Sequence, residues 1–266
     1  MVLVELNNVS FTYHSKVKNS GFALENINLV INRGDFISIL GPNGCGKSTL
    51  LKLIARLLTP VDGKLLFDNI EYDRIPLKKF TRRLAYVPQI TYSIYPFTVF
   101  EIVLMGRTPY LNLLGFENKK DIDLVNESLE KVGVYHLRDK GINEISGGEA
   151  QRAFIARALV QNPEIILLDE PNAHLDIEHQ VEIFNLLTTL NRNDNLTIVT
   201  VSHDLSLVGN YSQRALLMKQ GKIVLDDDKR SILTTDNIRE IFKVDSVVRY
   251  DQDREAILIN IVPERK

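Results

Sequence analysis

Short apolar runs alternate along much of the chain with segments in which apolar residues recur every three or four positions. The runs at Phe36–Leu40, Leu84–Val87, 165–168 and Thr197–Val201 are rich in apolar and β-branched residues and are bounded by polar or turn residues, a pattern typical of buried strands. Leucine and isoleucine recur at helical spacing over residues 49–58. This alternation predicts an α/β fold built on a parallel or mixed sheet.

The two ends of the chain carry other patterns. Residues 3–13 and 21–31 predict an antiparallel pair of strands, joined by the polar stretch 14–20. Beyond Gly221 the pattern predicts a strand, a helix near Thr235–Phe242 and two closing strands.

Residues from about 90 to 161 show mostly helical patterns with loops, which indicates a second lobe inserted into the first. We therefore expect a single domain with three parts. These are a catalytic core lobe at 1–89 and 162–222, an inserted helical lobe at about 90–161, and a C-terminal extension of the core lobe at 223–266.

Composition excludes several classes of protein. The 266 residues are 44% hydrophobic and 25% charged, with a formal net charge of −2, so global charge predicts neither nucleic acid nor an anionic membrane as partner. A single cysteine excludes an internal disulfide and suits a reducing compartment. No stretch reaches the ~20 apolar residues of a membrane span, and the first residues do not look like a secretion signal. Any membrane function is therefore expected to depend on a partner.

A glycine-rich turn follows the first buried run and precedes a helical pattern. Its sequence, Gly41-Pro42-Asn43-Gly44-Cys45-Gly46-Lys47-Ser48, has the spacing of a phosphate-binding P-loop. The glycines let backbone N–H groups converge on a phosphate, Lys47 adds a cation, and the Ser48 hydroxyl suits Mg²⁺. The pattern alone arises by chance in roughly one chain in a hundred of this length. The strand before it and the helix after it favour the phosphate site.

The apolar run at 165–168 ends in two carboxylates, Asp169 and Glu170. In a P-loop fold Asp169 would lie near Mg²⁺, and Glu170 could polarise the attacking water as general base. A solvated acidic turn after a buried strand is the simpler alternative, but the P-loop in the same chain makes a catalytic pair the better interpretation.

The segment 145–152 reads Ile-Ser-Gly-Gly-Glu-Ala-Gln-Arg. Ser146 and Glu149 form a capping box at the start of an amphipathic helix, which would by itself be a purely structural feature. Capping leaves Gly147 and Gly148 unexplained. Two glycines at a helix start allow a phosphate to approach the backbone N–H groups closely.

At this point the chain resembles the ATP-binding subunits of ABC transporters over essentially its whole length. The motifs of that family occur in order, and the ordered set is far more specific than any one of them. They are the P-loop from Gly41 to Thr49, Gln89, the signature at 145–149, the acidic strand at 165–170, the segment 173–176, and His203 after a strand.

The resemblance implies a head-to-tail homodimer with two ATP molecules at its interface. Each ATP would contact the P-loop of one chain and the signature of the other, namely Ser146, Gly147, Gly148 and Glu149. By the same resemblance Asp176 links the two sites across the dimer. An active ATPase is expected because no group that the chemistry requires is missing, although Ile145, Glu149 and Asn172 depart from the commonest family residues.

The resemblance also assigns roles to single residues of the nucleotide site. It implies that Gln89 contacts the metal and the attacking water, that His203 holds the γ-phosphate, and that Tyr13 stacks on adenine. Ordinary satisfied polar or strand residues would be the alternative for each one taken alone. ATP and Mg²⁺ are the implied cofactors.

The residues from 101 to 110 resemble the corresponding segment of bacterial importers for ferric siderophores, haem and vitamin B12. Some molybdate or tungstate systems share it. The resemblance implies separate transmembrane permease subunits, which would dock at about 90–114, an indirect solute-binding protein, and a peripheral location on the cytoplasmic face of the cell membrane. Core packing of the helical lobe is the alternative for the aromatic residues of that segment. Within this branch we favour an iron complex as the solute.

Two other classes of ABC protein remain as alternatives. A soluble ABC ATPase acting on ribosomes, DNA or a protein assembly usually carries two cassettes or long coiled coils, and neither is present. An exporter subunit is the nearer alternative, but many exporters fuse membrane spans to the cassette, and the 105–110 segment favours import.

Overall fold

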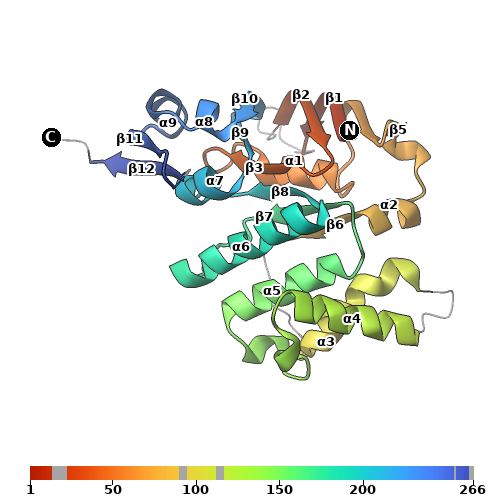
Figure 1. The fold of residues 1–266 in the computed structure, drawn as a ribbon. Helices are drawn as coiled ribbons and strands as arrows, with labels where there is room; N and C mark the ends of the chain where they lie inside the picture. The colour runs from red at the N-terminus through yellow and green to blue at the C-terminus, as the bar shows by residue number, and fades with distance from the viewer. Residues whose placement is uncertain (14–22, 90–94, 112–116, 255, 264–266) are drawn as a thin grey trace. The chain divides into compact units, whose positions relative to one another are not determined.

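A computed structural model describes residues 1–13, 23–89, 95–111, 117–254 and 256–263. The chain divides into two compact units (Figure 1). The terminal unit combines Met1–Arg74 with Thr197–Lys266, and the central unit is Ile75–Leu196. The chain thus leaves the terminal unit once and returns to it.

The first sheet of the terminal unit is antiparallel and has the strand order β2-β1-β4-β5. Its strands are β1 (Val2–Thr12), β2 (Ala23–Asn32), β4 (Asp62–Phe67) and β5 (Ile70–Glu71). Strand β1 pairs with both β2 and β4, and register shifts interrupt each ladder. The predicted pairing of residues 3–13 with 21–31 is confirmed for the described residues, whereas the polar stretch after Tyr13 lies outside them.

A second group of strands in the terminal unit carries the phosphate-binding turn. In the order β10-β9-β3-β8, these are β10 (Lys222–Asp228), β9 (Arg214–Lys219), β3 (Phe36–Leu40) and β8 (Thr197–Val201). Strand β3 is wholly buried and runs parallel to both β8 and β9, so the carboxyl ends of these three strands share one edge. Helices α1 (Lys47–Ile54) and α7 (Leu205–Tyr211) begin near that edge.

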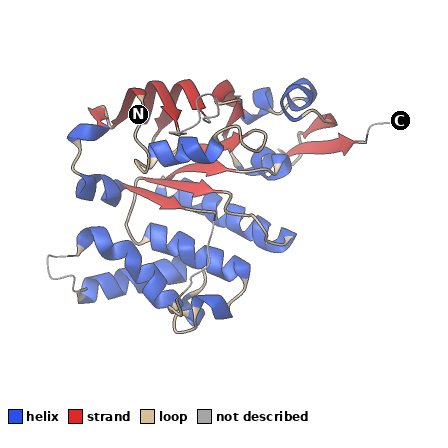
Figure 2. Cartoon of the chain, turned by 180° about the vertical axis from the view of Figure 1, so that it is seen from behind, coloured by secondary structure: helices blue, strands red, loops and turns tan. Residues whose placement is uncertain are grey.

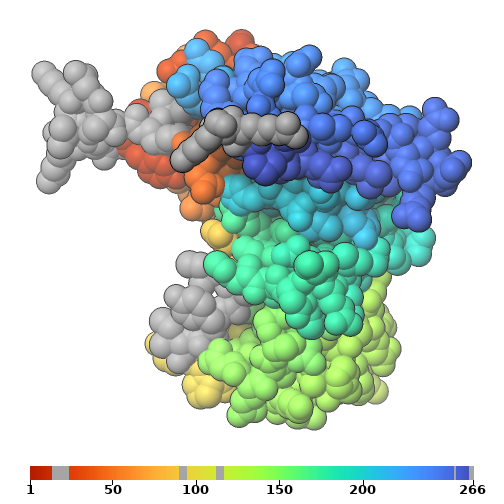
Figure 3. Space-filling view, turned by 90° about the vertical axis from the view of Figure 1, so that its left-hand side faces the viewer, coloured from red at the N-terminus to blue at the C-terminus, as the bar shows by residue number. Residues whose placement is uncertain are grey.

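The C-terminal segment belongs to the terminal unit. It contains α8 (Lys229–Ile232), α9 (Thr235–Phe242) and the antiparallel pair β11 (Asp245–Asp251) and β12 (Ala256–Val262). Ile257 of β12 shares a buried apolar cluster with Leu40, Val208 and Leu233. The hairpin, in the darkest blue of Figure 3, is therefore packed onto the rest of this unit.

The central unit contains one parallel strand pair and is otherwise mostly helical (Figure 2). Its strands are β6 (Leu84–Val87) and β7 (Ile165–Asp169). Its helices are α2 (Leu77–Arg83), α3 (Val99–Leu104), α4 (Lys119–Lys131), α5 (Gly147–Leu159) and α6 (Ile177–Asp194), with a 3₁₀ segment η2 (Met105–Tyr110) after α3. Helices α3, α4 and α5 each begin with a capping box.

The predicted α/β class is confirmed, and one predicted helix is corrected. The helix expected over 49–58 ends at Ile54, because Arg56 has a left-handed backbone with φ of 57°. Leu57 is consequently exposed. The boundaries of the compact units do not coincide with those expected for the three lobes, so the lobe boundaries stay a prediction. Among the described residues, no helix is both long and apolar enough to cross a membrane.

Candidate active site

The P-loop connects β3 to α1 in the terminal unit. Gly41, directly after β3, has φ of 152° and lies so close to the carbonyl oxygen of Met218 that an added Cβ would be 2.3 Å from it. Gly46 precedes α1 with φ of 113°, a conformation that residues with a Cβ rarely adopt. The loop is therefore held against strand β9 by a close approach that only glycine permits, while Asn43 and Gly44 remain exposed.

Lys47 is almost completely buried beneath this loop. Its Nζ donates to the carbonyl oxygens of Gly41 at 2.8 Å and Pro42 at 3.1 Å. The ammonium group therefore ties the start of the turn to the first residue of α1, where the positive end of the helix also lies. A positive charge and converging backbone N–H groups at one turn are the features that favour a phosphate.

Tyr13 lies beside the helix that follows the P-loop. Its hydroxyl is 3.4 Å from Thr49 Oγ1, and its ring packs edge-on against Phe11 with centroids 4.8 Å apart. The side chain is 42% exposed. An accessible aromatic face next to a phosphate-binding turn suits stacking on a base.

His203 follows β8 at the same sheet edge as the P-loop, because β8 is the parallel neighbour of β3. The chain then turns into α7. The Asp204 carboxylate accepts hydrogen bonds from the N–H groups of Ser206 and Leu207, and Ser202 Oγ accepts one from the N–H of Asp204. Capping on both sides fixes the backbone around an exposed histidine.

The central unit carries the two predicted carboxylates at the carboxyl end of β7. Asp169 is buried and accepts a hydrogen bond from the Tyr86 hydroxyl at 3.2 Å. Glu170 has a left-handed backbone with φ of 51° and accepts a hydrogen bond from Gln89 Nε2 at 2.7 Å. The structure therefore brings Gln89 and Glu170 together, which suits a carboxylate held in place to receive a proton from water.

The signature segment begins α5 as its sequence predicts. Ser146 Oγ accepts a hydrogen bond from the N–H of Glu149, and the Glu149 carboxylate accepts one from the N–H of Ser146. The bond from the Ser146 N–H, together with one from the Ser146 side chain, holds the pKa of Glu149 below its ordinary value. Gly147 and Gly148 form the first turn of the helix, where N–H groups have no intrahelical acceptor.

Asp176 caps α6 by accepting a hydrogen bond from the N–H of His179 at 2.9 Å. That backbone bond, together with a bond from the His179 ring, lowers the pKa of Asp176. Sequence reasoning missed His179 as it missed Tyr86. Each was detectable only as a polar side chain a few residues from a motif.

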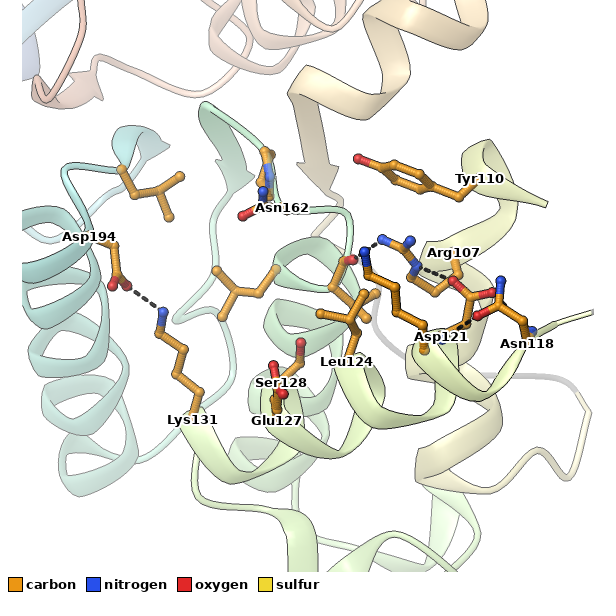
Figure 4. A pocket seen from close by; sticks show the side chains of 15 residues that line it. Arg107, Tyr110, Asn118, Asp121, Leu124, Glu127, Ser128, Lys131, Asn162 and Asp194 are labelled. Carbon is orange, nitrogen blue, oxygen red and sulfur yellow. Dashed lines mark hydrogen bonds and ion pairs between the residues drawn. The ribbon is translucent and has the colours of Figure 1, made fainter.

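The segment 105–110 forms η2, and its polar side chains bind the rest of the central unit. Arg107 is buried, donates to Asp121 Oδ1 and to the Val160 carbonyl oxygen at 2.8 Å each, and lies over the Tyr110 ring. The Tyr110 hydroxyl donates to the carbonyl oxygen of Gln161. Arg107, Tyr110 and Asp121 line one side of a cavity of about 600 Å³ (Figure 4). Arg107 and Tyr110 thus attach η2 to α4 and to the residues at the end of α5.

The predicted docking surface at 90–114 is described only in part, since residues 90–94 and 112–116 lie outside the described ranges. Within the described part, Tyr95 and Met105 are exposed, whereas Val103 is buried and Arg138 lies over the ring of Phe100. Some apolar side chains of this segment are therefore available to a partner, and others belong to the core of the unit.

Replacing Arg107 by methionine is expected to destabilise the protein by about 3–5 kcal/mol, because the Asp121 carboxylate would remain buried without its cation. Urea unfolding of both proteins would measure the difference. Arg82→Met is the matched control: Arg82 also lies over Tyr110, but it is only partly buried, so a loss near 1 kcal/mol or less is expected. Equal effects of the two substitutions would contradict the importance of the buried ion pair.

Comparison with known proteins places these motifs in one family. The ABC transporter family pattern matches residues 24–173. The ferric enterobactin transport ATP-binding protein FepC of Escherichia coli is 38% identical over 218 residues, covering 82% of this chain and 80% of that protein. The hemin import ATP-binding protein HmuV of Hahella chejuensis is 37% identical over 239 residues, covering 87% and 91%.

Solved structures agree with this assignment. A transporter assigned to the metal-chelate type, in an inward-facing conformation, matches with a TM-score of 0.86 at 29% identity and covers 100% of this chain and 99% of that chain. A dimeric ATP-binding cassette in a post-hydrolysis state with ADP and Pi matches with a TM-score of 0.74 at 32% identity, covering 86% and 99%. The chain with its ordered phosphate-binding and acidic motifs belongs to the ABC transporter family, as an ATP-binding subunit with ATPase activity.

Proposed function

We propose that this chain is the ATP-hydrolysing subunit of an importer for an iron complex, either a ferric siderophore or haem. It works as a homodimer, bound peripherally to separate permease subunits at the cytoplasmic face of the cell membrane. The observation that carries the solute class is the set of relatives named for siderophore, enterobactin, petrobactin, hydroxamate and hemin transport, each covered over most of its length. The motif at 105–110 supports the same class.

The terminal unit supplies the groups that bind ATP. The P-loop N–H groups and Lys47 hold the β- and γ-phosphates, Tyr13 stacks on adenine, and His203 approaches the γ-phosphate from the neighbouring strand β8. This assignment is supported by the shared edge of β3 and β8 and by the Tyr13–Thr49 contact. Stacking on an exposed ring is typically worth about 1–3 kcal/mol, so Tyr13 supplies only a part of the free energy of ATP binding.

We infer that Mg²⁺ is the second cofactor from the chemistry of three side chains. Ser48 offers a hydroxyl, Asp169 a buried carboxylate and Gln89 an amide oxygen, and oxygen donors are the ligands that Mg²⁺ takes. The bound ion would neutralise charge on the β- and γ-phosphates. Gln89 already donates through Nε2 to Glu170, which leaves its Oε1 for this role.

Glu170 acts as general base in the hydrolytic step. Its carboxylate accepts a proton from a water molecule as the water oxygen forms a bond to the γ-phosphorus. The bond to the β,γ-bridging oxygen breaks, and ADP and phosphate are the products. The hydrogen bond from Gln89 supports this role because it helps to hold the Glu170 carboxylate in a fixed orientation.

The partner chain completes each site by bringing Ser146, Gly147, Gly148 and Glu149 to the γ-phosphate, while its Asp176 connects the two sites. ATP then favours the closed dimer, and loss of phosphate removes that preference, so attached permease subunits experience two geometries. The support is the start of α5, where the N–H groups of Gly147 and Gly148 have no intrahelical acceptor and could face a phosphate.

The test is reconstitution of the chain with its permease in proteoliposomes, followed by ATPase measurement with different loaded solute-binding proteins. Stimulation is expected with a ferric-siderophore or haem binding protein. Binding proteins loaded with vitamin B12 or molybdate are the matched comparisons. Stimulation by one of these alone would contradict the iron-complex assignment, and failure to assemble with any permease would contradict an importer subunit.

A further inference from the structure

The side chain of His179 is bound to the loop that carries Asp176. Its Nδ1 is 2.6 Å from Asp176 Oδ1, and its backbone N–H donates to the same oxygen at 2.9 Å. The carboxylate is therefore held by one residue through both backbone and side chain. The backbone bond is an ordinary helix cap. The ring bond is additional, and capping alone does not require it.

The other side of the His179 ring lies against the signature. A Cβ built on Gly148 would be 2.1 Å from Cδ2 and 2.6 Å from Cγ of His179. The ring therefore occupies the space that a side chain at position 148 would need. Leu175 makes a similar but looser contact, because a Cβ on Gly147 would be 3.3 Å from its Cδ2. Residues on either side of Asp176 thus pack onto two consecutive glycines of the signature.

One further bond joins the same two helices about one turn beyond this contact. Arg152 of α5 donates to Glu182 of α6 at 3.1 Å. The charged groups facing His179 are therefore Asp176 and Glu182 on its own segment and Arg152 on α5. The hydrogen bond to Asp176 is the main cause that raises the pKa of His179, since it outweighs partial burial and the Arg152 charge. The protonated ring strengthens a bond to a carboxylate.

We infer that His179 is a positioning residue that joins the Asp176 loop to the signature tip, so that both meet the partner chain's nucleotide as one body. The inference rests on the proposed function, in which both elements act across the dimer. It adds a requirement that the motifs do not contain: Asp176 needs a hydrogen-bond donor from the side chain at position 179, and Gly148 leaves the space that this side chain occupies.

Two substitutions separate the ring contact from the hydrogen bond. In His179→Phe a ring remains against Gly148, but no atom can bond Asp176. In His179→Asn the amide nitrogen can take the place of Nδ1, whereas the ring is lost. Each is measured for ATP affinity at concentrations where the chain is monomeric, for the turnover number and KM of ATP hydrolysis, and for thermal unfolding.

We expect His179→Phe to lower the turnover number about tenfold or more, because a group acting across the dimer is misplaced, with ATP affinity of the monomer unchanged. His179→Asn should recover most of that loss, within about threefold of the unaltered chain. The ATP-dependent dimer seen on a sizing column in a Glu170→Gln background should weaken with Phe and persist with Asn. A defect in folding alone would lower the unfolding temperature, and it would reduce the turnover number and the monomer's ATP binding together.

Three results would overturn the role of His179. They are turnover of His179→Phe within about twofold of the unaltered chain, an equal loss in the Phe and Asn variants, and a loss of ATP affinity by the monomer. Failure of the unaltered chain to bind ATP would instead contradict the proposed function. If the unaltered chain hydrolyses ATP normally and the Phe variant is unaffected, the positioning role is contradicted but the proposed function is not.

Discussion

Glu170→Gln is expected to slow ATP hydrolysis by about 10²–10⁴-fold while ATP binding is retained. The amide has nearly the same shape as the carboxylate, and its oxygen can still accept the hydrogen bond from Gln89 Nε2. What it cannot do is take a proton from the attacking water. The turnover number, measured with saturating ATP and Mg²⁺, should therefore fall much more than the affinity for ATP.

The same variant tests the dimer. Because ATP stays uncleaved, Glu170→Gln with ATP should elute from a sizing column as a dimer, and without ATP it should elute later. Glu130→Gln is the control, since it makes the same chemical change at an exposed position on α4. A turnover number for Glu170→Gln close to that of the control would remove Glu170 from the role of general base.

Much of the fold follows from local sequence patterns, because burial on both faces leaves a continuous apolar signal. The strands at Phe36–Leu40, Leu84–Val87 and Thr197–Val201 and the helix at Thr235–Phe242 have the bounds that the patterns predict. Strand β4 escaped prediction, since only two of its six residues are buried. The early end of α1 escaped because it depends on the left-handed backbone of Arg56, a residue type that does not signal a helix end.

The sequence predicts the candidate site as a set of residues, but it does not predict the contacts between them. Gln89 and Glu170 are 81 positions apart, and Tyr86 and Asp169 are 83 apart, so their hydrogen bonds appear only after β6 and β7 pair. Gly148 shows a related limit. Its motif suggests close approach of a phosphate, whereas the structure adds the ring of His179 as a second reason for glycine. A single sequence does not reveal which distant side chain occupies the space that a glycine leaves.

Lys47→Ala is expected to weaken ATP binding by about 10- to 100-fold, which corresponds to the loss of charge-assisted hydrogen bonds worth about 1.5–3 kcal/mol. In the described structure the ammonium group bonds the carbonyl oxygens of Gly41 and Pro42, so it is already present at the turn where the phosphates are expected. Isothermal titration with ATP would measure the change. Lys52→Ala is the matched control on the same helix, and its ATP affinity should be unaltered.

Lys47 has a structural effect as well, and the two effects must be separated. Removing Nζ leaves two loop carbonyls without that donor, which should lower the free energy of unfolding by about 1–3 kcal/mol even without nucleotide. Adenosine separates them, because it lacks phosphates and depends on stacking rather than on the ammonium charge. If Lys47 acts on the phosphates, Lys47→Ala lowers the affinity for ATP far more than the affinity for adenosine. An equal loss of affinity for both ligands would mean that Lys47 only shapes the loop. It would contradict the assignment of Lys47 as the cation of the phosphate site.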